Sequence, residues 1–107
     1  MKGTMCGLVK ETAAPGKFVY RTDLPIPQIG DDEVLIKVHC TAVCSTDLHI
    51  MDWDKWSQAR IHPPMIPGHE TAGDIVEVGK NVHDRKVGDR VSCETHVPCG
   101  TCWFCKN

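Results

Sequence analysis

The stretch Val34-Leu35-Ile36-Lys37-Val38-His39-Cys40 decides the fold, because its apolar side chains recur at every second position. Val34, Ile36, Val38 and Cys40 would lie on one face of an extended chain, with Leu35, Lys37 and His39 on the other. This period of two is typical of a β-strand that buries one face. The stretch therefore predicts a half-buried β-strand.

Shorter strands are predicted on both sides, at residues 5–9, 17–20, 75–78 and 91–93. The turn Ala14-Pro15-Gly16 separates the first two, and residues 24–27 form an extended loop because two prolines remove ladder donors. Helical character is confined to Ser45 through about Met51, with Ser45 as the N-cap. Many short strands with Gly and Pro between them predict a mainly β chain, an irregular barrel or sandwich with one short helix.

Composition and charge argue against nucleic-acid and membrane partners. The chain has 107 residues, the size of one domain, and a formal charge of -2. That charge argues against nucleic acid as a partner, because phosphate binding needs a basic surface. No apolar run is long enough to cross a bilayer, and the first residues lack the pattern of a signal peptide. We therefore expect no membrane partner and a cytoplasmic location.

Three of the seven cysteines form one loop, Cys99-Gly100-Thr101-Cys102-Trp103-Phe104-Cys105. Two residues between successive thiols allow a tight turn to bring the sulfurs to a single ion. The pattern favours a metal site over a disulfide framework. Zinc and an iron–sulfur cluster both remain open, because a fourth ligand is needed to separate them. Cys6, Cys40 and Cys93 are predicted to be buried thiols, and His39, His62 and His83 strand or surface histidines.

A second set of metal-binding residues is spread along the chain. Cys44, His69 and Glu70 could hold zinc with one position open, because catalytic zinc takes three ligands of mixed N, O and S type. Thr46 and His49 are three residues apart and would share a helix face, so they could pass a proton from a zinc-bound hydroxyl to solvent. Taken singly, each residue also has an ordinary structural explanation, such as a core thiol, a helix start, a surface imidazole or a turn.

The order of these motifs resembles the zinc-containing medium-chain dehydrogenase/reductase superfamily. The motifs are Cys44-x-Thr46-x-x-His49, Gly68-His69-Glu70, Gly88-Asp89-Arg90-Val91 and the cysteine loop. The resemblance implies a chaperonin-10 (GroES)-like, partly open β-barrel. It also implies catalytic zinc on Cys44, His69 and Glu70, a relay through Thr46 and His49, and structural zinc on Cys99, Cys102 and Cys105.

Within the superfamily the chain is similar to the L-threonine 3-dehydrogenase family. Two features carry this similarity: Trp53 and Trp56 follow the histidine to which the resemblance gives the relay role, and the segment Ser92-Cys93-Glu94-Thr95-His96 leads into the cysteine loop. That similarity implies L-threonine as substrate, with Trp53 in contact with it, and a homo-oligomeric parent, a tetramer. An alternative is that Trp53 and Trp56 are an i, i+3 pair that packs on the core.

NAD would bind outside this chain, because no G-x-G-x-x-G fingerprint occurs in residues 1–107. The resemblance thus makes residues 1–107 an incomplete amino-terminal zinc-binding catalytic domain, inactive alone, with a fourth structural cysteine beyond Asn107. Two alternatives stay open: a polyol or secondary-alcohol dehydrogenase such as one for sorbitol or butanediol, and a stand-alone zinc-binding interaction module. The module would need Cys93 or His96 as the fourth ligand of the loop.

Overall fold

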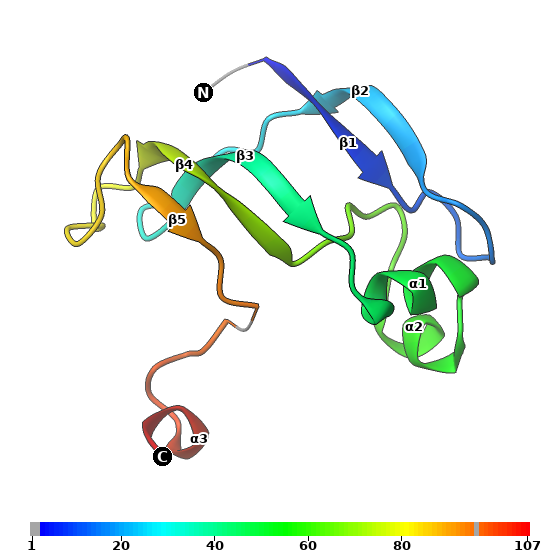
Figure 1. Cartoon of the computed structure of the whole chain (residues 1–107). Helices are drawn as coiled ribbons and strands as arrows, with labels where there is room; N and C mark the ends of the chain where they lie inside the picture. The colour runs from blue at the N-terminus through cyan, green and yellow to red at the C-terminus, as the bar shows by residue number, and fades with distance from the viewer. Residues whose placement is uncertain (1–2, 96) are drawn as a thin grey trace.

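The computed structural model describes residues 3–95 and 97–107. Its strands and helices, in chain order, are β1 Thr4–Val9, β2 Val19–Pro25, β3 Val34–Ala42, α1 Ser45–Asp52, α2 Lys55–Arg60, β4 Glu70–Val78, β5 Arg90–Ser92 and α3 Trp103–Lys106. Strands dominate, which confirms the prediction of a mainly β chain (Figure 1).

The strands form two antiparallel sheets. One pairs β1 with β2, and the other has the order β3-β4-β5. β3 and β4 make the longest ladder, from Val34 opposite Val78 to Ala42 opposite Glu70, with two register shifts. Helices α1 and α2 lie together beyond one end of this ladder, while α3 lies at the end of a separate arm (Figure 1).

The predicted strand at residues 34–40 is confirmed as part of β3, which lies at the edge of its sheet next to the central β4, but its predicted buried face is only partly present. Val34 and Ile36 are half-buried, whereas Val38 is 53% exposed and Cys40 is also exposed. The predicted burial of Cys6 is likewise wrong, and Cys93 is only half-buried. The physical reason is that no described element packs over these side chains, so alternation along a strand does not by itself produce burial.

The helix and loop predictions need three corrections. The described residues form three helices rather than the one predicted, because α2 and α3 were missed. The N-cap of α1 is Cys44, not Ser45. The second strand runs to Pro25, so residues 24–27 are not wholly a loop. A proline is tolerated there because it is the last residue of a strand in a two-stranded sheet, where few ladder donors are needed.

Asp74 connects all three strands of the larger sheet through its carboxylate. Its Oδ2 lies 2.8 Å from Nε2 of His39 on β3, and its Oδ1 accepts from Nε of Arg90 on β5 at 2.9 Å. The Arg90 guanidinium, followed by the His39 imidazole, lowers the pKa of Asp74 to about 2. This ion network therefore favours the folded sheet as long as Asp74 is ionised.

Replacing Asp74 with asparagine is expected to lower the melting temperature at pH 7 by a few degrees. Because the folded pKa lies below the usual 3.8, the stabilisation is fully present above pH 3.8 and is lost as the pH falls toward 2. The difference in melting temperature between the two proteins, measured by circular dichroism, should therefore shrink between about pH 4 and pH 2. A constant difference over that range would contradict the assignment.

Candidate functional site

Cys44 and His69 meet at the end of the β3–β4 ladder although 25 residues separate them in the sequence. The last ladder pair is Ala42 with Glu70, so the residues just beyond β3 and just before β4 continue side by side. The Cys44 Sγ lies 3.2 Å from the His69 Nε2, and both residues are half-buried. Gly68 has a φ of +108°, a backbone conformation that suits glycine, and the chain turns there into His69.

Asp47 is the third member of this group, and sequence reasoning gave it no role. It lies in the first turn of α1 and is only 5% exposed. Its Oδ2 accepts a hydrogen bond of 3.1 Å from the backbone N–H of Cys44. Its Oδ1 is buried and has no hydrogen-bond partner among the described residues. A buried carboxylate oxygen without a partner is costly, so a cation or a further donor at this point would stabilise the site.

The donor set fits zinc. Ligand atoms of Cys44, Asp47 and His69 all lie within 4.8 Å of one another. A thiolate, an imidazole and a carboxylate are the mixed ligands that catalytic zinc takes in proteins. Glu70 is not in this group: it is exposed at the start of β4, where it lines a hollow of about 350 Å³ together with Cys40 and Thr71.

Thr46 and His49 both belong to α1, as predicted, and lie three residues apart along it. Thr46 is half-buried, whereas the His49 side chain is 59% exposed. The His49 Nδ1 lies 3.0 Å from the Oδ2 of Asp54, so a carboxylate orients the imidazole from the solvent side. The Ser57 backbone N–H, chiefly, and His49 lower the pKa of Asp54. The arrangement would let His49 take up a proton as an imidazolium next to an ionised carboxylate.

Asp54 was also missed, although the sequence carried a signal for it. It is the N-cap of α2, and its Oδ1 accepts from the Ser57 backbone N–H at 2.9 Å. An Asp immediately before a helix start is a common cap. The short helix α2 was not predicted, because its six residues show no clear apolar period.

Trp53 is the C-cap of α1 and adopts a left-handed backbone with φ of 57°. Trp56 belongs to the next helix, α2, and is 43% exposed. The alternative of an i, i+3 pair that packs on the core agrees with the half-burial of Trp53 but not with the exposure of Trp56. The half-buried Trp53 lies in the connection between α1 and α2, directly after the helix that carries Thr46 and His49.

The cysteine loop forms the second metal-binding group. The Cys99 and Cys105 sulfurs are 3.7 Å apart, and those of Cys102 and Cys105 are 3.5 Å apart. The hydroxyl of Thr101, then backbone N–H groups of Thr101 and Cys102, lower the pKa of Cys99 to about 6. Hydrogen bonds to sulfur thus favour the thiolate, which is the form that binds a metal. Three convergent thiols fit a tetrahedral structural zinc, which needs one further ligand.

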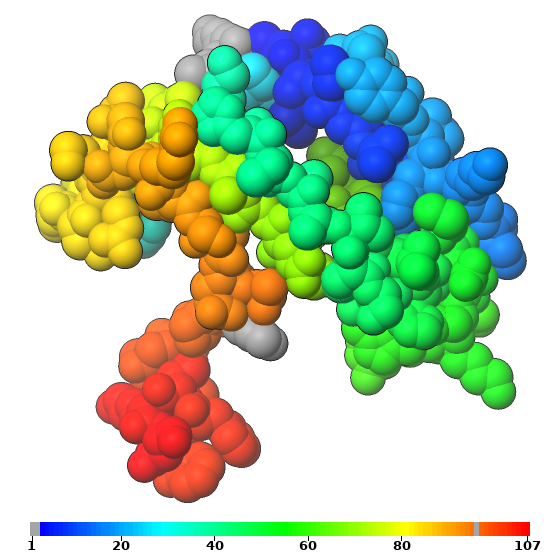
Figure 2. All heavy atoms as spheres, viewed as in Figure 1, coloured from blue at the N-terminus to red at the C-terminus, as the bar shows by residue number. Residues whose placement is uncertain are grey.

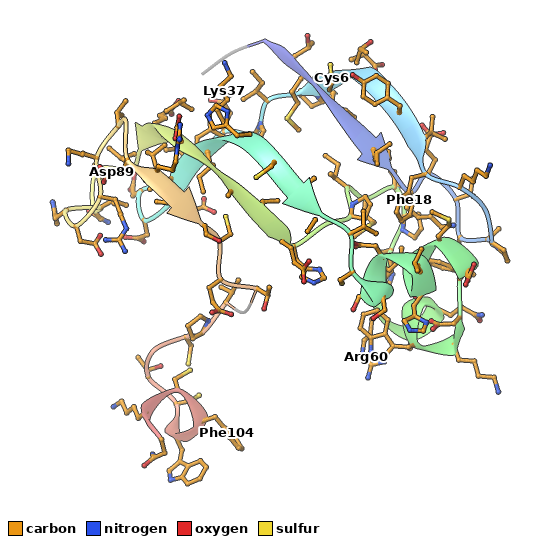
Figure 3. All side chains as sticks on the ribbon, in the orientation of Figure 1. Cys6, Phe18, Lys37, Arg60, Asp89 and Phe104 are labelled. Carbon is orange, nitrogen blue, oxygen red and sulfur yellow. The ribbon has the colours of Figure 1, made fainter. Side chains whose placement is uncertain are left out.

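The loop lies on an extended arm, away from the two sheets (Figure 2). Trp103 and Phe104 on α3 are 70% and 84% exposed, and Phe104 points away from the sheets in Figure 3. Cys93 lies near the end of β5 and does not join the three thiols in the described part of the chain. His96, the other residue proposed as the fourth ligand, lies outside the described residues.

Comparison with known proteins agrees with this geometry. Residues 30–107 match the family described as the alcohol dehydrogenase GroES-like domain. The chain belongs to that family. The match covers both metal-binding groups, and it confirms the predicted GroES-like architecture. In the described residues of this GroES-like domain no helix has both the length and the apolar character needed to cross a membrane.

Curated relatives of this GroES-like domain include L-threonine 3-dehydrogenases. That of Thermococcus kodakarensis is 50% identical over all 107 residues. That of Legionella pneumophila is 51% identical over 102 residues, or 95% of this chain. The chain spans only about 30% of the length of these relatives.

Solved structures show the same fold in other dehydrogenases. The zinc-dependent alcohol dehydrogenase 2 of Streptococcus pneumonia superposes with a TM-score of 0.83 at 31% identity. The galactitol-1-phosphate dehydrogenase of Escherichia coli superposes with a TM-score of 0.80 at 32% identity. Each alignment covers 95% of this chain and 28% of the other chain.

Proposed function

We infer that residues 1–107 are the amino-terminal, zinc-binding part of an NAD-dependent enzyme that oxidises the side-chain hydroxyl of L-threonine to 2-amino-3-oxobutanoate. The contact of 3.2 Å between the Cys44 Sγ and the His69 Nε2 carries this proposal, because it brings two metal donors to one point. The 50% identity to an L-threonine 3-dehydrogenase supports the choice of substrate. A polyol or secondary alcohol is the rival substrate class.

Cys44 and His69 would hold the catalytic zinc, with Glu70 as the third ligand that the family resemblance implies. Bound zinc would lower the pKa of the hydroxyl that it carries. Asp47 fixes the backbone of Cys44 and places a free carboxylate oxygen beside the donor atoms. It would either face the ion or accept from the imidazole N–H of His69, and both interactions favour the metal-bound state.

The proton of the substrate hydroxyl would leave through Thr46 and His49. A hydroxyl can donate and accept at once, so the half-buried Thr46 can connect a buried site to the exposed imidazole. Asp54, 3.0 Å from the His49 Nδ1, keeps that ring oriented. Trp53, next to this helix end, would contact the substrate.

The remaining components would lie outside residues 1–107. NAD binds to a separate domain in this proposal, and a fourth thiol completes the structural zinc of Cys99, Cys102 and Cys105. All seven cysteines of this chain are free thiols, which supports a reducing compartment such as the cytoplasm. We propose a homo-oligomer, a tetramer, for the whole enzyme.

The function is tested on the full-length protein that carries this chain. We expect NADH formation from L-threonine with kcat/KM about a thousandfold higher than for sorbitol or 2,3-butanediol. The 107-residue chain alone should form no NADH, because it has no site for the hydride acceptor. A preference for sorbitol or butanediol would assign the enzyme to the rival substrate class. NADH formation by the 107-residue chain would contradict the proposal that NAD binds to a separate domain.

The third zinc ligand can be identified by comparing two isosteric variants, Glu70→Gln and Asp47→Asn. If Glu70 is the third ligand, we expect Glu70→Gln to weaken zinc affinity most strongly, and Asp47→Asn to weaken it by only about 10–100-fold through its contact with Cys44. Zinc titration with a competing chelator measures the affinity. Loss of zinc from Asp47→Asn together with full zinc in Glu70→Gln would reverse the two roles.

Replacing Cys102 with alanine is expected to remove one of two zinc ions per full-length chain. Three thiols converge in this loop, and a structural site that loses a ligand loses most of its affinity. Metal analysis by mass spectrometry measures the stoichiometry, with Cys6→Ala as the control because Cys6 is a free thiol on β1, outside both metal-binding groups. Two zinc ions in Cys102→Ala would contradict a structural site here.

A further inference from the structure

Lys10 is a buried cation that the proposed chemistry does not use. It directly follows β1 and is 1% exposed, the lowest value for any charged residue that the structure describes. In the described part of the chain, no carboxylate forms an ion pair with it. A buried ammonium group without a counter-ion is expensive unless other groups replace its water shell. Its position therefore requires a strong local set of acceptors.

The acceptors are backbone carbonyl oxygens from two segments. The Lys10 Nζ donates to the carbonyls of Ala14, Gly16 and Met51, the last two at 3.2 Å. Met51 lies in the last turn of α1, where the partial negative charge of the helix favours a cation. The Nζ also lies 5.6 Å from the centroid of the Trp53 ring, within the range of a cation–π contact. One ammonium group thus contacts both the end of α1 and its C-cap tryptophan.

The backbone of Lys10 contacts the segment that leads to the other half of the site. Its N–H donates to the Met65 carbonyl at 2.8 Å, and its carbonyl accepts from the Met65 N–H at 3.0 Å. Met65 lies four residues before His69. Lys10 therefore contacts two segments at once: the end of the helix that carries Thr46 and His49, and the strand bridge before the zinc-binding histidine.

We propose that Lys10 is a positioning residue that holds the Trp53 side chain in place for binding a small amino-acid alcohol. The proposal depends on the proposed function, because it takes Trp53 as a substrate contact. The structure places the Lys10 ammonium group over the Trp53 ring, and the same group donates to the Met51 carbonyl in the last turn of α1. Lys10 itself touches no reacting atom.

The test uses Lys10→Met, which keeps the length of the side chain and removes its charge, in the full-length protein. We expect the KM for L-threonine to rise about tenfold while kcat changes less than about threefold. Zinc content should be unchanged. Lys17→Met is the matched control, because it makes the same replacement at an exposed lysine on the β1–β2 connection. Lys10→Arg keeps a cation and should restore most of the affinity.

A spectroscopic measurement separates this proposal from the function on which it depends. With 5-fluorotryptophan in the protein, the fluorine resonance that disappears in Trp53→Phe belongs to Trp53. Lys10→Met should shift that resonance and leave those of Trp56 and Trp103 in place, whether or not L-threonine is the substrate. In a Trp53→Phe background the KM effect of Lys10→Met should fall below about threefold, because the two residues act through one contact.

Several outcomes would overturn the proposal. The proposal fails if Lys10→Met leaves the Trp53 resonance unmoved. It also fails if Lys10→Met lowers the zinc content and kcat together with the rise in KM. Failure of both Lys10→Met and Lys10→Arg to fold would assign Lys10 to stability alone. If the unsubstituted protein does not oxidise L-threonine but the Trp53 resonance shifts, the substrate assignment fails and the positioning of Trp53 by Lys10 stands.

Discussion

Full-length protein carrying His69→Ala or Cys44→Ala is expected to lose one zinc ion per chain and at least about a thousandfold in kcat/KM. The two donor atoms lie 3.2 Å apart, so each supplies one of very few ligands at a single point. Removing either leaves too few ligands to hold the ion against water. Metal analysis and NADH formation from L-threonine measure the two losses.

His62→Ala is the matched control for this experiment. It removes an exposed imidazole that lies outside both metal-binding groups, and it should keep both zinc ions. Retention of full zinc and activity by His69→Ala would show that Cys44 and His69 do not share an ion, and the dehydrogenase proposal would then fail. Cys102→Ala is expected to lose the structural zinc and His69→Ala the catalytic one, so comparing these two variants distinguishes the two zinc sites.

A single methyl group at Gly73 is expected to destabilise the fold strongly. A Cβ at this position would overlap the backbone carbonyl oxygen of Lys37 on the neighbouring strand, and it would crowd the Ile36 side chain. Gly73 pairs with Val38 next to a register shift of the β3–β4 ladder, so backbone rather than a movable side chain blocks the methyl group. We expect Gly73→Ala to destabilise the domain by about 3 kcal/mol or more.

The measurement is thermal unfolding of the full-length protein by circular dichroism, where this loss corresponds to a drop of about 10 °C or more. Gly30→Ala is the control. Its added Cβ would meet mainly the Oε1 of Glu33, the end of a flexible side chain that can move. Equal melting temperatures for Gly73→Ala and the unsubstituted protein would mean that the two strands separate more easily than this geometry indicates.

The sequence by itself was enough to predict the mainly β architecture and to select most of the site residues. Alternation at residues 34–40 is a local property, and it led to β3. The spacing of two residues between thiols is also a local property, so the sequence alone predicted that Cys99, Cys102 and Cys105 form one group. The family resemblance extended this to Cys44, His69, Thr46 and His49, whose spacing along the chain is characteristic.

Tertiary structure alone decided which groups meet. Cys44 contacts His69 because the register of the β3–β4 ladder aligns the end of one strand with the start of the other, and register is a property of pairing between distant segments. The same pairing left Glu70 outside the group of donors and brought in Asp47, whose role depends on burial at the start of α1. Lys10 could not be predicted as buried, because lysine is usually exposed. Its burial depends on nearby carbonyls of Ala14 and Gly16 together with the distant carbonyl of Met51, which replace its water. Local patterns specify which chemistry a residue can perform, whereas long-range packing determines its partners.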